Sequence, residues 1–390
     1  MIGEAARVAP PGRASVANPA IADFTANDRR HMARALELAG RGLYTTSPNP
    51  RVGCVIVQDG HVIGEGWHER AGEAHAEAAA LADARERQRD VQGATLYVTL
   101  EPCNNHGRTP PCVDALVAAG IARVIVASRD PNPAQAGGAA RLRAHGVVVD
   151  IGLMQAEADA LNVGFLSRHH RAIPWVRSKI AASVDGRTAL VNGDSRWITG
   201  ADARADGHAW RARACAVLTG VGTVLHDDPR LDVREVPTTR QPLRIVVDRR
   251  ADTPERARIL AEGDALVITA GAGNDRWPAG TETIAVPDGE GRVDLVAMLR
   301  ELARRGINEL HVEAGAKLNG ALLGAGLIDE LVIYVAGSVI GDPSRGMFEL
   351  GVPLASLDAR VALEWVSVDR IGDDLRLVAR VRRTAASSAA

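Results

Sequence analysis

The stretch His75-Ala76-Glu77, followed by Pro102-Cys103 and Pro111-Cys112, decides the fold and chemistry of the first half of this chain. A zinc ion that activates water needs three protein ligands and one open position, and imidazole and thiolate are its usual ligands. His75, Cys103 and Cys112 supply such a set. Glu77 follows the histidine by two residues, where a carboxylate can carry a proton without binding the metal. The stretch therefore predicts a catalytic zinc site.

This pattern is typical of zinc deaminases, in which an H-x-E motif precedes P-C-x-x-C and the glutamate acts as acid and base. The chain departs from the pattern because eight residues, 104–111, separate its two cysteines. A closed structural zinc site, or three unrelated buried side chains, are the alternatives. Neither alternative predicts the nearby carboxylate or a proline before each cysteine, so we favour catalytic zinc.

Length and charge limit the remaining possibilities. At 390 residues, the chain should form about two domains, each with its own core. A net charge of −2 gives no electrostatic reason to expect nucleic acid or membrane as a partner. Of the 46 basic residues only Lys179 and Lys317 are lysines, which makes both candidates for chemistry that arginine does not perform.

The cysteines and the termini point to a cytoplasmic protein. Cys54 and Cys215 lie in apolar runs that we interpret as core strands, so we expect no disulfide framework. No apolar run reaches membrane-spanning length. Residues 1–22 are rich in Ala, Pro and Arg, and we expect this segment and the tail 385–390 to be disordered.

Residues 23–152 are expected to form a first α/β domain. Its helices are predicted over 27–43, 75–90, 111–119 and 138–145, and its strands over 52–57, 61–67, 95–100, 123–127 and 147–151. Both His75 and Cys112 then begin helices, where the helix dipole favours a thiolate and an anionic transition state. A linker over 153–172 should contain one connecting helix, 154–170.

Residues 173–384 are expected to form a second α/β domain. The predicted strands cover 175–180, 215–219, 243–248, 265–269, 282–286, 309–313, 328–335, 361–366 and 374–382, and the helices 201–213, 293–305 and 317–325. Such alternation predicts a largely parallel sheet with helices on both faces. No G-x-G-x-x-G motif follows its first strand, which argues against a Rossmann dehydrogenase.

Two stretches of the second half look directed at a nucleotide. The turn from Glu313 to Gly320 runs from a strand end into a helix, and its glycines would let backbone N–H groups approach phosphate. Arg249 follows another strand, where it could pair with a 2′-phosphate and favour NADP over NAD. A glycine-rich turn is more often only a tight connection between a strand and a helix, and an arginine after a strand is more often a solvated surface charge. Trp197 could stack on a ring or pack in the core.

With both halves considered, the chain resembles the bifunctional deaminase/reductase family of riboflavin biosynthesis from about Asp23 to Arg383. The long spacing between the cysteines is typical of that family, although Asn104-Asn105 stands where a Ser-His pair is common. The matching stretches are Pro48-Asn49-Pro50 with 52–57, His75-Ala76-Glu77, Leu100 to Cys103, His106 to Cys112, Ala182 to Thr188, Asp227-Asp228-Pro229 and Val312 to Gly315.

The resemblance implies a cytidine-deaminase-like three-layer α/β/α domain followed by a dihydrofolate-reductase-like α/β domain. The implied substrate is 2,5-diamino-6-(5-phosphoribosylamino)pyrimidin-4-one, whose ring amine is hydrolysed before NADPH reduces the ribosyl group to ribityl. Zinc ligation carries over to His75, Cys103 and Cys112, and proton donation to Glu77. Reductase substrate contacts carry over to Ser195, Arg211, Leu231, Arg234 and Glu313, and NADP contacts to Ala181, Trp197, Thr223, Asp227, Arg249 and the segment Gly315, Ala316, Lys317, Leu318, Asn319, Gly320 and Ala321.

The predicted roles agree with ordinary chemistry. Asn49 and the loop 104–109, with His106 and Arg108, suit the pyrimidine substrate and its phosphoribosyl end. Arg211 and Arg234 could hold the 5-phosphate in the reductase. Lys179 is our candidate for a hydrogen bond to the reacting sugar, and a surface lysine at a strand edge is the equal alternative.

Two alternative functions are possible, a deaminase of another substrate and a non-catalytic scaffold, and the assembly state is a separate question. A deaminase of another nucleotide or of RNA should show a basic surface near the zinc, which a near-neutral chain disfavours. A non-catalytic nucleotide-binding scaffold should have lost part of the motif, yet His75, Glu77, Cys103 and Cys112 are all present. We also expect a homo-oligomer, either a dimer or a tetramer.

Overall fold

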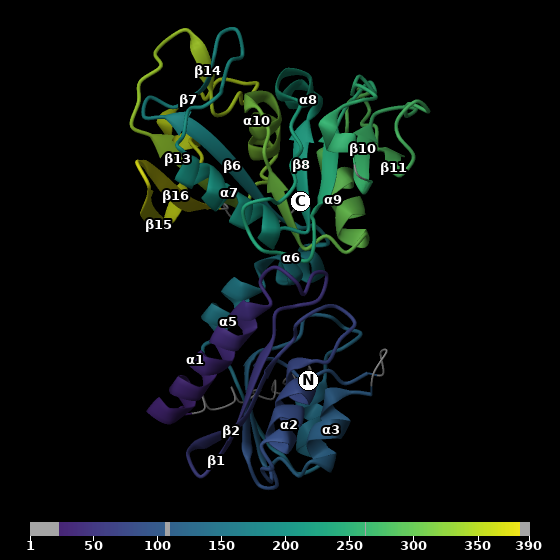
Figure 1. Cartoon of the computed structure of the whole chain (residues 1–390), viewed down its shortest axis with the longest axis vertical. Helices are drawn as coiled ribbons and strands as arrows, with labels where there is room; N and C mark the ends of the chain where they lie inside the picture. The colour runs from purple at the N-terminus through teal and green to yellow at the C-terminus, as the bar shows by residue number, and fades with distance from the viewer. Residues whose placement is uncertain (1–22, 106–109, 262, 383–390) are drawn as a thin grey trace, which may run out of the picture.

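The computed structural model describes residues 23–105, 110–261 and 263–382. The predictions for 1–22, 385–390, His106 and Arg108 lie outside these residues. The chain forms a five-stranded sheet and a nine-stranded sheet, each covered by helices, together with a two-stranded ribbon. Figure 1 shows the helix α6, Val163–Arg171, at the junction between the purple-to-blue first part and the teal-to-yellow second part.

The first part is a three-layer α/β/α unit, as predicted. Its sheet has the order β2-β1-β3-β4-β5, in which β1 pairs antiparallel with β2 and β3, while β3, β4 and β5 are parallel. The helices are α1 Ala26–Arg41, α2 Ala76–Glu86, α3 Cys112–Ala118 and α4 Gly138–Ala144, and the strands are β1 Gly53–Gln58, β2 His61–Trp67, β3 Thr95–Leu100, β4 Arg123–Ser128 and β5 Val148–Ile151.

The two faces of this sheet bury different helices because alternate residues of a strand point to opposite sides. Val55 and Val57 pack with Met32, Ala35 and Leu38 of α1, on the face that α1 covers. The opposite face packs against α2, α3 and α4, and its buried residues include Cys54, Ile56, Ala80, Val113, Leu116 and Leu142. Five consecutive buried residues in β1 follow from this double cover.

The connecting segment differs from the single helix predicted over 154–170. It forms two helices, α5 Gln155–Leu161 and α6, which break at Asn162. The Asn162 side chain accepts from the Arg51 N–H at 2.8 Å and donates to the Arg51 carbonyl at 2.9 Å. A contact with a residue 111 positions earlier therefore sets the break, and local helix propensity does not reveal it.

The second part contains the largely parallel sheet that the alternation predicts. The order is β11-β10-β9-β8-β12-β6-β13-β16-β15. Strand β16 pairs antiparallel with both β13 and β15, and the other neighbouring strands pair in parallel. The strands are β6 Trp175–Ser183, β8 Ala216–Gly220, β9 Leu243–Val247, β10 Ala265–Thr269, β11 Thr281–Ala285, β12 Glu309–Val312, β13 Glu330–Ala336, β15 Leu363–Ile371 and β16 Asp374–Val381, and the helices are α7 Ala201–Arg213, α8 Val221–Asp227, α9 Leu295–Arg304 and α10 Ala316–Gly324.

Several predicted boundaries need correction. The predicted helix 75–90 ends at Glu86, and the predicted strand 175–180 continues to Ser183 because Ala181 to Ser183 keep pairing with β13. The sequence reasoning also missed α8 and a two-stranded ribbon made of β7 Arg187–Leu190 and β14 Ser344–Gly346. These three elements are short, so their periodicity is weak. Among the described residues, no helix is long and apolar enough to cross a membrane.

A buried polar junction joins the two parts. Glu309, at the start of β12, accepts from Arg51 of the first part at 2.6 Å, and both side chains are at most 8% exposed. The Asn308 amide donates to the Pro48 carbonyl at 2.8 Å. Gly164 of α6 lies so close to this strand that an added Cβ would approach the Asn308 carbonyl oxygen to 2.6 Å. The junction is thus closely packed and specific.

Candidate active sites

The structure brings the three predicted zinc ligands together. One ligand atom from each of His75, Cys103 and Cys112 lies within 4.8 Å of the other two. The Nδ1 atom of His75 faces both sulfurs, at 3.5 Å from Cys103 and 3.4 Å from Cys112. One imidazole and two thiols converging on one point form the donor set that tetrahedral zinc prefers, with a fourth position left for water or substrate.

Close packing of backbone segments places these ligands. His75 is the N-cap of α2 and Cys112 is the first residue of α3, as the sequence predicts. At Gly66 of β2, an added Cβ would lie 2.4 Å from a backbone nitrogen of α2, so only glycine lets the helix approach this far. Gly138 plays the same part beside the Pro102 carbonyl, which would lie 1.9 Å from its Cβ. These contacts fix the distance between β2 and α2 and the distance between α4 and the Cys103 loop.

Glu77 is buried beside the metal ligands. Its side chain interacts with the Cys112 thiol, and burial raises the pKa of the Glu77 carboxyl. The hydrogen bond between the two thiols, together with His75, lowers the pKa of Cys103, and the same hydrogen bond and burial raise the pKa of Cys112. The pair therefore favours a thiolate at Cys103, and thiolate is the form that binds metal. The buried Glu77 carboxyl lies where it can take and return a proton.

A cavity of about 230 Å³ opens beside the metal ligands. The predicted residues Asn49, His75, Glu77 and Cys103 line it. The other lining residues are Pro48, Pro50, Val52, His68, Ala76, Leu100, Glu101, Asp130, Asn132, Gln135, Phe165 and Arg168.

Asn49 is held in a defined orientation within this cavity. The Nδ1 atom of His68 lies 2.9 Å from the Ala74 carbonyl, so it carries the proton, and Nε2 is left to accept from the Asn49 amide nitrogen at 3.0 Å. The Asn49 amide is thereby fixed with its nitrogen toward His68. A fixed amide is suited to reading the edge of a heterocyclic ring.

Sequence reasoning missed one wall of the cavity. Asn132 belongs to Pro131-Asn132-Pro133, directly after Asp130. This triplet repeats the Pro-Asn-Pro around Asn49, and the repeat was a usable signal. Glu101 accepts from the N–H groups of Asp130 and Ala139, so it fixes this loop against α4. Burial raises the pKa of Asp130 to about 6. Phe165 and Arg168 come from α6, and no local motif marks them.

The predicted reductase residues Lys179, Arg211 and Glu313 form one cluster. Arg211 of α7 pairs bidentately with Glu313, through Nε to Oε1 and through Nη2 to Oε2 at 2.9 Å. Burial alone would raise the pKa of Glu313, but Arg211 outweighs it and holds that pKa well below its usual range. Burial lowers the pKa of Lys179, which Glu313 partly opposes.

Lys179 is therefore not the edge lysine of the alternative interpretation. It lies in the middle of β6, which is a central strand between β12 and β13, and its ammonium is 5.6 Å from the Tyr334 ring centroid. Only the last four residues of β6 separate it from the carboxyl end of the sheet.

The predicted NADP residues gather mostly at the carboxyl ends of parallel strands. Thr223 and Asp227 lie on α8 directly after β8, Arg249 is exposed just after β9, and Gly315 is the N-cap of α10 after β12. Ala181 lies near the end of β6. Trp197 is 70% exposed, and the Arg204 guanidinium lies 4.5 Å from its ring centroid, so it is not a core residue.

Helix α10 divides its predicted residues between two faces. Lys317 is exposed, and Ala316 and Leu318 are partly so. Asn319 is buried, where it accepts from Ser178 at 3.1 Å and donates to the Ala314 carbonyl at 2.9 Å. Gly320 lies against the backbone of Glu349. The first turn of α10 is thus the part that is open to a ligand, and Asn319 and Gly320 hold the helix in place.

Two of the remaining predicted substrate residues, Leu231 and Arg234, flank Asp232, which contacts the Arg211 side chain. Arg211 also donates to the Asp232 carbonyl at 3.1 Å, and Asp232 pairs with the exposed Arg234. Leu231, beside them, is buried, and Ser195 is partly exposed near Trp197. The structure thus brings Arg211 and Arg234 into one neighbourhood.

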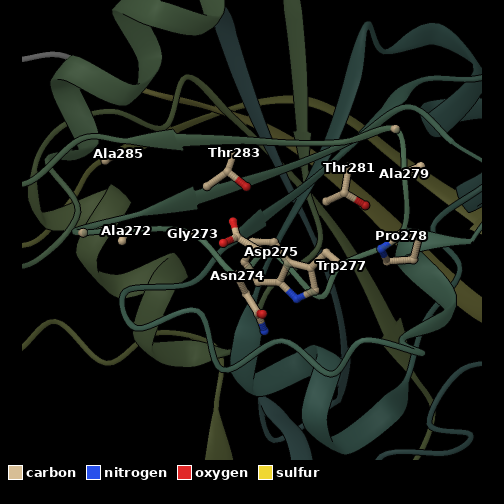
Figure 2. A pocket seen from close by; sticks show the side chains of 12 residues that line it. Ala272, Gly273, Asn274, Asp275, Trp277, Pro278, Ala279, Thr281, Thr283 and Ala285 are labelled. Atoms are coloured by element: carbon tan, nitrogen blue, oxygen red, sulfur yellow. The ribbon is translucent and has the colours of Figure 1, made fainter.

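A second hollow, of about 440 Å³, lies along β11 at the opposite end of the sheet from β15. Figure 2 shows Asn274, Asp275 and Trp277 of the loop after β10 beside Thr281 and Thr283 of β11. The indole nitrogen of Trp277 is already bonded to the Thr253 carbonyl at 2.9 Å. None of the predicted site residues lines this hollow, so we do not assign it to either site.

Family models agree with this division of chemistry. Residues 25–128 match the cytidine and deoxycytidylate deaminase zinc-binding region, and residues 174–377 match the RibD C-terminal domain. The protein is accordingly an enzyme that joins a zinc-binding deaminase domain to a reductase domain.

Individual relatives identify the family. The riboflavin biosynthesis protein RibD of Escherichia coli K12 is 47% identical over 337 residues, covering 83% of this chain and 91% of the relative. A solved structure of Acinetobacter baumannii RibD has a TM-score of 0.85 at 41% identity and covers 92% of this chain and 99% of that one. The Thermotoga maritima diaminohydroxyphosphoribosylaminopyrimidine deaminase/5-amino-6-(5-phosphoribosylamino)uracil reductase has a TM-score of 0.84 at 34% identity, covering 91% and 99%. The chain belongs to the RibD family of riboflavin biosynthesis.

Proposed function

We propose that this chain carries out two successive reactions, hydrolytic deamination of 2,5-diamino-6-(5-phosphoribosylamino)pyrimidin-4-one and NADPH-dependent reduction of the deaminated product. The observation that carries the first reaction is the convergence of His75, Cys103 and Cys112 beside a buried Glu77 and an open cavity. The observation that carries the second is the Lys179–Glu313–Arg211 cluster near the carboxyl edge of a parallel sheet, where ligands of such sheets bind.

In the deaminase site, His75, Cys103 and Cys112 would hold the zinc ion, which would supply Lewis acidity toward a water molecule. Glu77 takes one proton from this water and gives it to the ring nitrogen. It then takes the second proton from the added hydroxyl and gives it to the departing amine, which leaves as ammonia. Asn49, oriented by His68, reads the ring edge. The loop with His106 and Arg108 remains a predicted contact of the phosphoribosyl end.

In the reductase site, a bound NADPH would supply the hydride for reduction of the sugar at C1. Lys179 donates a hydrogen bond to the oxygen that gains charge, and Glu313 orients the sugar hydroxyls. Because Arg211 is committed to Glu313 in this structure, Arg234 is the freer of the two predicted phosphate ligands. We place the cofactor along Ala181, Thr223, Asp227, Arg249 and the first turn of α10.

The domain limits that we propose are 23–152 for the deaminase and 173–384 for the reductase. Four free cysteines fit the reducing cytoplasm that the sequence predicts. The proposed homo-oligomer is supported by the edge strand β15, on which Trp365, Val366 and Val368 are each more than half exposed. Mass photometry of the wild type and of Trp365→Glu tests that surface.

One incubation tests the proposed function. Zinc-loaded chain, mixed with the diaminopyrimidine phosphate, should release one equivalent of ammonia without NADPH. Added NADPH should then be oxidised only after ammonia has been released. Oxidation of NADPH with the undeaminated compound and no ammonia would contradict the proposed order.

A further inference from the structure

The connecting helix α6 supplies part of the deaminase cavity, although it lies outside the predicted deaminase domain. Phe165 and Arg168 are three residues apart, so they share one face of the helix, and both line the cavity that contains His75 and Glu77. Arg168 is the only arginine or lysine among the described residues that line this cavity.

The Arg168 guanidinium lacks an acidic partner. Among the described residues, no carboxylate lies within ion-pair distance of it, and its buried Nε has no hydrogen-bond partner there. Its Nη2 atom lies 3.3 Å from His169 Nε2. Arg171, one turn later, instead pairs bidentately with Asp329, with both distances 2.8 Å. Burying a cation with an unused hydrogen-bond donor costs free energy unless an anion binds beside it.

The packing around α6 fixes where this cation lies. A Cβ added at Gly306 would be 3.5 Å from Arg168 Nη1 and 3.5 Å from Pro48, so the guanidinium sits where the reductase domain, α6 and the deaminase loop meet. Gly164, four residues before Arg168 and on nearly the same face of the helix, lies against Asn308 of the second domain. Arg168 thus lines the cavity where α6 contacts the second domain.

The charges of the cavity decide which part of a substrate this cation receives. The other ionisable groups of the lining include the acids Glu77, Glu101 and Asp130, which repel a phosphate. A ring amine must reach the metal ligands, while the phosphate of the same molecule needs a cation and a place away from those acids. Among the described lining residues, Arg168 supplies a guanidinium, which pairs bidentately with phosphate.

We propose that Arg168 binds the 5-phosphate of the deaminase substrate, with Phe165 beside it as an apolar wall for the sugar. The deaminase site is then completed by the connecting helix. This inference rests on the proposed function, and it names a phosphate ligand that the motif loop does not contain.

The test compares two substrates on the full-length zinc-loaded chain. Arg168→Gln should lower kcat/KM for ammonia release from the phosphorylated pyrimidine by about 10- to 100-fold, the loss expected for one charged hydrogen-bonded contact. It should change kcat/KM for the dephosphorylated substrate by less than about 2-fold, because that molecule has nothing to pair with Arg168. Arg168→Lys should restore part of the phosphate preference.

Controls separate phosphate binding from folding. Arg171→Gln removes an arginine of the same helix and a structural ion pair, so it should lower thermal stability and leave the phosphate preference unchanged. Binding of ribose 5-phosphate is measured by calorimetry in the Arg234→Gln background, which removes the proposed phosphate ligand of the reductase. It should weaken when Arg168→Gln is added and not when Arg171→Gln is added. An equal loss on both substrates, or unchanged ribose 5-phosphate binding, would overturn the role of Arg168. If the wild type binds ribose 5-phosphate through Arg168 but releases no ammonia, the proposed reaction fails while the anion site stands.

Discussion

Replacing Glu309 by glutamine tests whether one buried carboxylate holds the two domains together. Its Oε1 accepts from Arg51 Nη1 at 2.6 Å, and its Oε2 accepts from Arg177 Nη1 at 3.0 Å and from Arg213 Nε at 2.7 Å. Arg177 also pairs with Glu330. Three guanidinium groups therefore share two carboxylates, and the Glu309 side chain is only 1% exposed.

The expected loss follows from these contacts. A hydrogen bond to a charged group contributes about 1.5–3 kcal/mol, so three contribute roughly 4.5–9 kcal/mol. Glutamine keeps one acceptor oxygen and removes the cost of burying a carboxylate, which recovers part of that sum. Because removal of one partner from a buried ion pair costs about 3–5 kcal/mol, we expect a loss of ~3–5 kcal/mol in the free energy of unfolding.

Differential scanning calorimetry of the full chain measures this loss. For a domain of this size, 1 kcal/mol corresponds to about 2–4 °C, so the reductase transition should fall by roughly 6–20 °C. The matched control is Glu282→Gln, because Glu282 pairs bidentately with Arg305 at 2.6 and 2.7 Å but is 57% exposed. That control should cost about 0–1 kcal/mol. Equal, small shifts for both variants would refute the reasoning.

The pH dependence gives the same prediction a second readout. Burial alone would raise the pKa of Glu309, but its three arginines hold that pKa far below the ordinary value of 4.5. The unfolded state therefore binds the proton first as pH falls, so the contribution of Glu309 is complete above about pH 5 and declines below it. The stability difference between the wild type and Glu309→Gln should shrink as pH is lowered from 5 toward 3.

Four further predictions concern the two sites. Cys103→Ser should reduce bound zinc well below the one ion per chain expected of the wild type, and undiminished zinc by metal analysis would contradict the ligand assignment. Glu77→Gln should keep zinc but lose at least 100-fold in ammonia release, with reduction of supplied deaminated substrate unchanged. Arg249→Ala should raise the KM for NADPH about 10-fold and leave that for NADH nearly unchanged, and an equal effect on both cofactors would place Arg249 elsewhere. Lys179→Met should lower the kcat of reduction more than it raises the substrate KM, and a steady-state rate equal to the wild type would remove Lys179 from the reaction.

Local patterns predicted most of the fold and the metal centre. Strands β3 and β10 and helix α7 have the predicted boundaries, because apolar runs and helical periods of that length leave little ambiguity. The zinc ligands were predictable because His75-Ala76-Glu77 and the two Pro-Cys pairs specify the donor set, and His75 and Cys112 do lie at helix starts. The types and spacing of residues near one another in the sequence were enough to predict these features.

Features set by distant contacts were not predictable in this way. The break at Asn162 depends on Arg51, and the wall formed by Phe165 and Arg168 depends on how α6 packs against the second domain. A helix with a basic last turn predicts only a helix end. The residues missed at the deaminase site are mostly those that a segment remote in sequence brings to the cavity.

The position of α6 also bears on why the two domains share one chain. Phe165 and Arg168 of this helix line the deaminase cavity, and the neighbouring Gly164 lies against Asn308, directly before β12. His311 lies two residues after Glu309 in β12, and Glu313 of the reductase cluster directly follows the end of this strand. The zinc ligands all lie within residues 75–112 of the first domain, whereas the phosphate site that we propose lies where α6 contacts the second domain. Fusion of the two domains therefore has a structural consequence for the first reaction, even if no intermediate passes directly between the sites.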